Sequence, residues 1–263
     1  MKCDYHMHSV FSHDSSTPME SQAAQSVKLG MDEICFTDHV DYCEDYESYS
    51  GYFAEIERVR QEFSGKLVIR AGWEFGMERQ SIPEFQGLFS RYRDKLDFVL
   101  LSIHYIDDLE LWAHEYQRGK SQAEYTLGYY GELLNLVQKY HDYSVLAHLD
   151  LISRYDMNQG ISPYPFEKVR DIAAEIMETA IREGKGIELN TSSWRYGLTE
   201  TTPSREILKL YRDLGGEILT LGSDAHNPGY VGAHFDEGRE ILRGLGYTKF
   251  CTFEKMKPSF HVL

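Results

Sequence analysis

Short runs of apolar and β-branched residues alternate along the chain with longer amphipathic segments. The short runs predict strands at 2–8, 33–37, 67–72, 98–103, 144–148, 186–190 and 218–222, with a weaker eighth at 249–253. Strands separated by helices pair in parallel through βαβ units, so the pattern predicts an α/β fold. No linker rich in proline, serine or glycine divides the chain, and we expect a single domain over residues 1–263.

The amphipathic segments predict the helices between these strands. The first has Thr17 as its N-cap residue and Pro18 in its first turn, and it ends at Gly30. Further helices are predicted at 51–64, 83–95, 121–141, 165–184, 203–214 and 235–245. The helix at 203–214 has the clearest boundaries, with Thr202 or Pro203 at its start and two glycines at its end. We expect the segments 41–52 and 105–120 to be loops.

Polar side chains with metal-binding chemistry stand at the ends of the predicted strands. Asp4, His6 and His8 alternate along the first strand, so they point to one face. The later strands end at Asp38 and His39, Glu74, His104, His148, Asn190, and Asp224 with His226. In a β/α barrel the carboxyl ends of the strands meet at one mouth, so we expect these side chains to converge.

This pattern favours a metal centre over unrelated polar residues. Any one of these side chains alone would more often be structural or solvent-exposed, but almost every strand end carries His, Asp or Glu. Neutral imidazoles and carboxylates together suit Zn²⁺, Fe or Mn²⁺. The set exceeds what one ion can bind, so it predicts a multinuclear centre with a bridging carboxylate.

Several motifs also resemble those of a known family. The stretches DYHMHSVFSHDS, CFTDHVDY, GWEF, LLSIHY, LAHLDLISRY and GSDAH are similar, in order and spacing, to the motifs of the PHP (polymerase and histidinol phosphatase) superfamily. The segments FSHDSSTPME, EICFTDH and ELNTSSWR most resemble its histidinol-phosphate phosphatase branch. The resemblance spans nearly the whole chain. It implies a distorted (β/α)7 TIM-like barrel whose active site, with two or three divalent metal ions, lies at the carboxyl ends of the strands.

The resemblance also implies which residues bind each ion. The ligands implied for one ion are His6, His8, Glu74 and Asp224. Glu74 would bridge to a second ion, bound also by His104 and His148. The third would be held by His39, His226 and a residue of the loop after the first strand, where the spacing favours Asp14 and leaves His13 as the alternative. We expect Asp38 to orient His39 or a bound water rather than to bind metal.

Bridged metal ions lower the pKa of bound water and neutralise charge on a phosphoryl group. With the resemblance, this implies a phosphomonoesterase that hydrolyses L-histidinol phosphate by attack of metal-bound hydroxide, with Asp14, Glu74 and His226 as catalytic residues. Arg154 and Arg195 stand in loops expected at the mouth and are candidates for binding the substrate phosphate. The sequence has no Ser–His–Asp or Cys–His arrangement, no phosphate-binding loop, and no G-x-G-x-x-G after the first strand.

Composition narrows the substrates and partners. With 42 acidic and 27 basic residues the formal net charge is −15, which disfavours long nucleic acids and anionic membranes. A small phosphorylated metabolite remains compatible, because bound metal inverts the local field. No apolar run approaches membrane-spanning length and the four cysteines form no C-x-x-C pair, so we expect a cytoplasmic enzyme. No pattern predicts an oligomeric state.

Three other functions fit parts of the pattern. The first is a PHP-type phosphoesterase that acts on nucleotides or short oligonucleotide ends, which the acidic composition limits to short substrates. The second is a metal-binding or regulatory protein without turnover, which the nearly complete ligand set disfavours. The third is an amidohydrolase-like barrel, but no lysine stands at a predicted strand end as a candidate for carbamylation.

Overall fold

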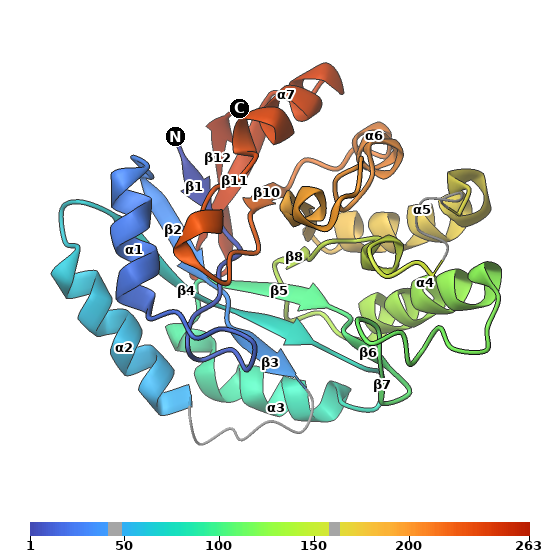
Figure 1. Cartoon of the computed structure of the whole chain (residues 1–263), viewed down its shortest axis with the longest axis horizontal. Helices are drawn as coiled ribbons and strands as arrows, with labels where there is room; N and C mark the ends of the chain where they lie inside the picture. The colour runs from blue at the N-terminus through green and yellow to red at the C-terminus, as the bar shows by residue number, and fades with distance from the viewer. Residues whose placement is uncertain (42–48, 158–163) are drawn as a thin grey trace.

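In a computed structural model, which describes residues 1–41, 49–157 and 164–263, a curved parallel sheet forms the centre of the molecule. The order of its strands is β1-β2-β4-β5-β8-β9-β10 (Figure 1). These are β1 (Cys3–Asp4), β2 (Glu33–Phe36), β4 (Val68–Gly76), β5 (Phe98–Ser102), β8 (Val145–Leu146), β9 (Gly186–Asn190) and β10 (Leu219–Gly222). Every residue of β2, β5, β9 and β10 is buried, as in parallel strands covered on both faces.

The sheet closes between its first and last strands. Beyond β1 the chain runs alongside β10, where the backbone N–H of Tyr5 donates to the carbonyl of Leu221 at 2.9 Å. His8 donates in the same way to the carbonyl of Ala225 at 2.9 Å. A parallel bridge between Met7 and Ala225 completes the contact. The predicted distorted (β/α)7 barrel is therefore confirmed, although β1 is much shorter than the predicted strand 2–8.

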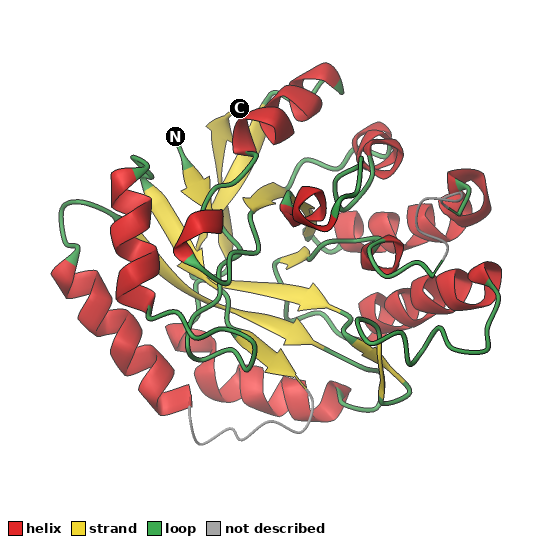
Figure 2. Cartoon of the chain, viewed as in Figure 1, coloured by secondary structure: helices red, strands yellow, loops and turns green. Residues whose placement is uncertain are grey.

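Helices surround the barrel on its outside (Figure 2). They are α1 (Met19–Lys28), α2 (Tyr49–Glu62), α3 (Ile82–Tyr92), α4 (Gln122–Lys139), α5 (Phe166–Arg182), α6 (Arg205–Asp213) and α7 (Phe235–Gly244). Short 3-10 helices lie between these elements at η2 (Arg93–Lys95), η3 (Leu151–Ser153), η4 (Ser192–Tyr196) and η5 (Pro228–Tyr230). The start of α4 is fixed by a capping box between Ser121 and Glu124. Among the described residues, no helix is both long and apolar enough to cross a membrane.

Two predicted helix starts were wrong. The first helix begins at Met19, and the Thr17 hydroxyl does not cap it but donates to the carbonyl of His226 at 2.9 Å. The helix predicted at 203–214 begins at Arg205, with Ser204 as the N-cap residue in place of Thr202 or Pro203. The Thr202 hydroxyl pairs with Ser193 Oγ at 2.7 Å, so in both cases a tertiary contact engages the threonine that was expected at the helix start.

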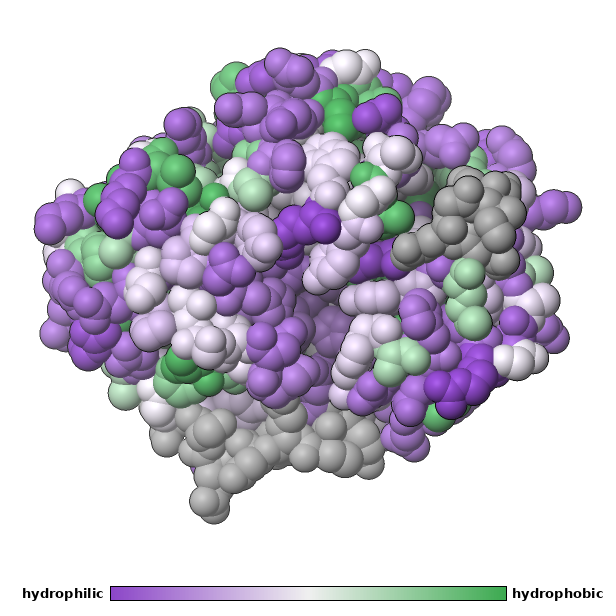
Figure 3. Space-filling view, in the orientation of Figure 1, coloured by the Kyte–Doolittle hydropathy of each residue, from purple (hydrophilic) through white to green (hydrophobic). Residues whose placement is uncertain are grey.

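The two predicted loops contain regular structure. Asp41 ends β3 (His39–Asp41), which pairs with β4, and α2 already begins at Tyr49; residues 42–48 lie outside the described part of the chain. The segment 105–120 contains a hairpin of β6 (Tyr105–Ile106) and β7 (Leu109–Glu110). The eighth predicted strand exists as β11 (Lys249–Glu254), but it pairs with β12 (Lys257–Val262) outside the barrel sheet. Figure 3 shows a hollow with hydrophilic residues around it near the middle of the face seen in Figure 1.

Candidate metal centre

Glu74 lies in β4, and its neighbours fix the direction of its side chain. Trp73 packs against Phe53 of α2 and Phe75 against Phe85 of α3, with ring centroids 5.3 and 4.9 Å apart. Because side chains alternate along a strand, Glu74 points the other way, into the barrel, where it is fully buried. The sequence placed Glu74 beyond the strand end, but β4 continues to Gly76.

The two carboxylate oxygens of Glu74 face different histidines. Oε1 lies 2.7 Å from His148 Nε2 and 3.2 Å from His104 Nε2. Oε2 lies 3.1 Å from His6 Nε2 and 3.0 Å from His39 Nδ1. A carboxylate whose two oxygens serve separate groups of imidazoles can bridge two metal ions.

Asp224 follows β10 and faces the histidines of the first strand. Its Oδ1 lies 3.4 Å from His8 Nε2 and 3.8 Å from His6 Nε2. The backbone on either side of it is held by Arg195, which donates to the carbonyls of Ser223 at 2.8 Å and of Asp224 at 2.7 Å. The last strand of the barrel thereby delivers a carboxylate to the ligands of the first.

Asp14, His39 and His226 form a third, more accessible group. Asp14 Oδ2 lies 2.9 Å from His226 Nε2, and its Oδ1 lies 3.6 Å from His39 Nε2. His13 stacks on the His39 ring at a centroid distance of 5.3 Å, and its Nδ1 lies 3.9 Å from Asp41 Oδ2. Asp14 thus contacts both histidines of this group, whereas His13 contacts His39 and Asp41.

Most of the predicted ligands fall into overlapping groups with the spacing of a metal site. In each group three ligand atoms lie within 4.8 Å of one another. The groups are His8–His39–His226, His6–Glu74–His148, His6–His8–Asp224 and His39–Glu74–His104. Of the predicted ligands only Asp14 is in none of these groups. His104 and His148, implied to share an ion, occur in separate groups, although both face Glu74 Oε1.

Buried imidazole nitrogens of these groups make no hydrogen bond. Three of them, His8 Nε2, His39 Nδ1 and His226 Nε2, face other ligands, and His148 Nδ1 is a fourth such nitrogen. The first three nevertheless lie near a carboxylate oxygen, at 3.4, 3.0 and 2.9 Å respectively. Buried polar atoms rarely lack a partner, and a cation between imidazole and carboxylate would satisfy both. The residues present thus fit an ion such as Zn²⁺.

The carboxylates of the centre are ionised at neutral pH. Burial alone would raise the pKa of Glu74, but the surrounding histidines outweigh it and hold that pKa well below its usual range. The same balance lowers the pKa of Asp224. Burial lowers the pKa of His104, but Asp41 and Glu74 outweigh it and raise that pKa to about 9. The ionised Glu74 and Asp224 therefore supply negative charge that can bind cations.

Three residues that the sequence analysis did not single out hold the imidazoles in place. Glu188 Oε1 lies 2.7 Å from His6 Nδ1, and Asp41 Oδ1 lies 2.9 Å from His104 Nδ1. Ser12 Oγ lies 3.0 Å from the Nδ1 of His8. Such partners fix the orientation of a ligating imidazole. One signal was available in the sequence, because Glu188 is an acidic residue within the apolar strand GIELN.

Two further acidic residues support the loops around the centre. Asp38 accepts from the Ser12 hydroxyl at 2.8 Å, and that hydroxyl accepts in turn from the backbone N–H of His39 at 3.0 Å. Asp38 thus reaches His39 through Ser12. Asp4 accepts from the backbone N–H groups of Ser223 at 3.0 Å and Gly232 at 2.9 Å, so it anchors the loop after β10 and belongs to none of the metal groups.

Comparison with known proteins identifies the family. The family model of the PHP domain matches residues 4–192. The chain belongs to the PHP family, in its histidinol-phosphatase branch. It is 31% identical to the histidinol-phosphatase of Lactococcus lactis, over 97% of this chain and 96% of that protein. It is 28% identical to a probable histidinol-phosphatase of Deinococcus radiodurans, over 97% of this chain and 98% of that one.

Two solved structures have the same fold. The histidinol phosphate phosphatase of Lactococcus lactis, complexed with zinc, L-histidinol and phosphate, superposes with a TM-score of 0.89 at 30% identity, covering 98% of both chains. A putative histidinol phosphatase of Listeria monocytogenes gives a TM-score of 0.80 at 17% identity, covering 90% of this chain and 99% of that one. The second likeness supports the fold alone.

The two predicted phosphate-binding arginines of this PHP protein lie on either side of Asp224. Arg154 is 5% exposed; its guanidinium donates to Asp224 Oδ2 at 3.4 Å and also to Ser192 Oγ. Arg195 is partly exposed and lies over the ring of Tyr230, 4.4 Å from its centroid. Both cations therefore stand at the edge of the metal centre.

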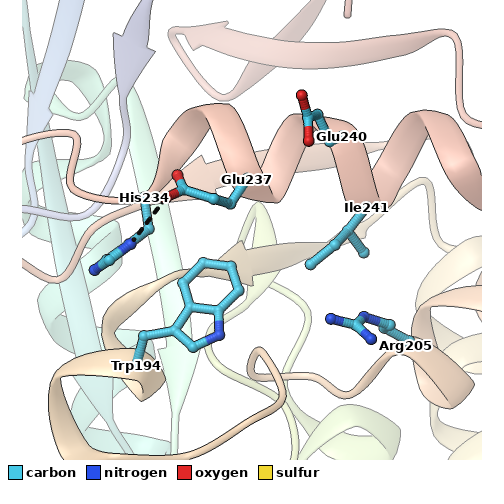
Figure 4. Close-up of a pocket in the computed structure, with 6 residues that line it drawn as sticks. All are labelled: Trp194, Arg205, His234, Glu237, Glu240 and Ile241. Atoms are coloured by element: carbon cyan, nitrogen blue, oxygen red, sulfur yellow. Dashed lines mark hydrogen bonds and ion pairs between the residues drawn. The ribbon is translucent and has the colours of Figure 1, made fainter.

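A pocket outside the PHP metal centre lies between η4 and α7 (Figure 4). Its lining residues are Trp194, Arg205, His234, Glu237, Glu240 and Ile241. None of them belongs to the metal groups. Trp194 and Arg195 are adjacent in sequence but contact different parts of the molecule. Trp194 packs against His234 in this pocket, with ring centroids 5.1 Å apart, and Arg195 donates to the backbone carbonyl of Asp224.

Proposed function

We propose that this protein is a metal-dependent histidinol-phosphatase that hydrolyses L-histidinol phosphate to L-histidinol and phosphate, as a cytoplasmic step of histidine biosynthesis. The observation that carries the proposal is the convergence of imidazoles and carboxylates on Glu74, beside two arginines, in a chain related over nearly its whole length to histidinol-phosphatases. The relative in Lactococcus lactis binds zinc, L-histidinol and phosphate, and the same chemical classes fit the site here.

The ions in this proposal are two or three of Zn²⁺, Mn²⁺ or Fe. The residues proposed to hold them are His6, His8, Glu74 and Asp224; Glu74 again with His104 and His148; and His39, His226 and Asp14. When bound, such ions activate water at neutral pH and neutralise the charge of a phosphoryl group. Glu74 keeps its charge at neutral pH, so it would supply negative charge to the ions.

Asp14 and His226 are proposed to move the proton. Their side chains are 43% and 25% exposed, so they can reach a substrate at the mouth. Asp14 Oδ2 and His226 Nε2 lie 2.9 Å apart, so the two side chains stand together at the mouth. The pair would take the proton of the attacking water and deliver one to the leaving alkoxide of L-histidinol.

Arg154 and Arg195 are proposed to bind the substrate phosphate. Each presents a planar guanidinium, which can form two parallel hydrogen bonds to phosphate oxygens. Arg154 is held by Asp224 and Ser192, and Arg195 by two backbone carbonyls, so both are oriented before substrate arrives. This preorganisation lowers the entropic cost of binding.

The experiment that tests the proposed function is phosphate release from a panel of phosphate esters, with the metal content measured on the same sample. The panel contains L-histidinol phosphate, mononucleotides, dinucleotides, sugar phosphates and p-nitrophenyl phosphate. We expect the highest kcat/KM on L-histidinol phosphate, with two or three ions per chain. A preference for nucleotides would refute the substrate and support the nucleotide phosphoesterase instead.

A further inference from the structure

A buried glutamate contacts two histidines of the metal centre that come from different strands. Glu188 lies in the middle of β9 and is fully buried. Its Oε1 lies 2.7 Å from His6 Nδ1, and its Oε2 accepts from the backbone N–H of His148 at 2.8 Å. His6 and His148 meet again at Glu74, each through its Nε2 atom. Glu188 therefore supports one side of a group whose other side faces Glu74.

The contact with His6 determines which ring nitrogen is free to bind metal. Both ring nitrogens face a carboxylate, but only Nε2 faces the ligands Glu74 and Asp224. With an ion on that side, the hydrogen would stay on Nδ1 and be donated to Glu188 Oε1. That Nε2 lies 3.1 Å from Glu74 Oε2 and 3.8 Å from Asp224 Oδ1, where an ion would bind.

The contact with His148 acts on its backbone. His148 has a φ of +22°, which residues with a side chain rarely adopt. The hydrogen bond from its N–H to Glu188 stabilises this conformation, and the conformation in turn directs His148 Nε2 to Glu74 Oε1.

Gly222 of β10 provides the space for the Glu188–His6 pair. A Cβ at this position would lie 1.9 Å from Glu188 Oε1 and 2.5 Å from His6 Cβ, closer than non-bonded atoms approach. Gly76 of β4 has the same relation to the second carboxylate–imidazole pair: its Cβ would lie 1.7 Å from Asp41 Oδ1 and 2.6 Å from His104 Nδ1. The repetition indicates that both glycines are required by the orientation of the ligands.

We propose that Glu188 is a positioning residue of the metal centre, which fixes the tautomer of His6 and the backbone of His148, and that Gly222 is required to leave room for it. The inference rests on the metal-binding part of the proposed function. It does not depend on the identity of the substrate, because zinc binding can be measured without one.

The test is a zinc titration of the full-length, metal-depleted protein. Glutamine at position 188 keeps the size of the side chain but has one acceptor oxygen, so either His6 Nδ1 or the His148 N–H loses its partner. We expect E188Q to bind at least one zinc ion about 10–100-fold more weakly than the wild type. The matched control is Glu33→Gln, a buried glutamate of β2 whose partners Tyr5 and Arg70 are in none of the metal groups. It should bind zinc like the wild type.

A second pair of variants changes the same contact while Glu188 is kept. Gly222→Ala should also weaken zinc binding. Gly72→Ala is its control, because a Cβ at Gly72 would crowd Cys35 Sγ at 2.8 Å and the Phe98 carbonyl at 2.9 Å, neither of which is in the metal groups. Circular dichroism and thermal unfolding establish that each metal-free variant is folded before titration.

Wild-type zinc affinity in folded E188Q would overturn the proposal, as would an equal loss in Gly222→Ala and Gly72→Ala. If neither E188Q nor Gly222→Ala folds, nitrogen-15 NMR of the zinc-loaded wild type decides. We expect the Nδ1–H tautomer for His6, and the Nε2–H tautomer would overturn the proposal. A wild type that binds no zinc would overturn the metal centre and this inference together. Zinc binding without hydrolysis of L-histidinol phosphate would refute only the substrate.

Discussion

Replacing Glu74 with glutamine would test whether one carboxylate joins the metal groups. Glutamine has nearly the same shape, but it offers one acceptor oxygen and an amide that donates. The amide must face either His104 and His148, or His6 and His39. Whichever side it faces loses a ligand and meets a hydrogen-bond donor, so we expect one group to lose its ion.

The size of the effect follows from the position of Glu74 among the ligands. Removing a residue that only orients a ligand lowers metal affinity by about 10–100-fold. The Glu74 oxygens lie 2.7–3.2 Å from four imidazole nitrogens, where they would bind the ions directly, so we expect a larger loss. A loss above about 100-fold is more than ~2.7 kcal/mol. With fewer ions to neutralise the phosphoryl group, kcat/KM should fall by at least ~1000-fold, or about 4 kcal/mol.

The assay is metal analysis after dialysis against a zinc buffer that just saturates the wild type, followed by phosphate release from L-histidinol phosphate. The control is Glu132→Gln, because Glu132 is also buried but accepts from the backbone N–H of Arg79 at 2.9 Å, outside the metal groups. It should keep its zinc and its rate. Full zinc occupancy in Glu74→Gln, with kcat/KM within about tenfold of the wild type, would refute the bridging role.

Three further predictions concern charge and metal. Arg154→Lys keeps the charge but loses the planar fork, so KM for L-histidinol phosphate should rise about tenfold at unchanged metal content; an unchanged KM would contradict phosphate binding by Arg154. In metal-free protein, protonated His104 stabilises the fold fully below its unfolded pKa of 6.5, and this is lost as the pH rises through its folded pKa of about 9. The free energy of unfolding measured with urea should fall by about 3 kcal/mol over that pH range, and by less in His104→Gln. Chelation should lower Tm, since zinc at 100 times its Kd adds about 2.7 kcal/mol per site; a Tm independent of zinc in calorimetry would contradict this.

The convergence of the ligands could be predicted from the sequence because it depends on topology. Parallel strands joined by helices end at one edge of the sheet, so polar residues after successive strands meet there wherever the exact strand ends lie. This is why His6, His148 and Asp224 were placed correctly near one another, although β1 and β8 are each shorter than predicted. Errors of a few residues in strand length did not change which edge a residue reaches.

The residues that orient the ligands could not be predicted in this way, because their roles depend on contacts distant in sequence. Glu188 meets His6 across 182 positions and His148 across 40. Asp41 was assigned to a loop, but it ends a strand paired with β4 and holds His104. Glu74 lies inside β4 because that strand continues its pairing with β5 as far as Gly76, and this depends on the partner rather than on the local sequence.

The ligands also connect metal binding to closure of the barrel. β1 has two residues, and beyond it residues 5–8 join the last strand by a few backbone hydrogen bonds. Side chains strengthen this junction: Asp4 anchors the loop after β10, and His6 and His8 face Asp224 across the closing edge. An ion held by these residues would add strong bonds where the backbone provides few. Loss of metal should therefore loosen first the contact between the two ends of the sheet, because the same side chains form the site and close the fold.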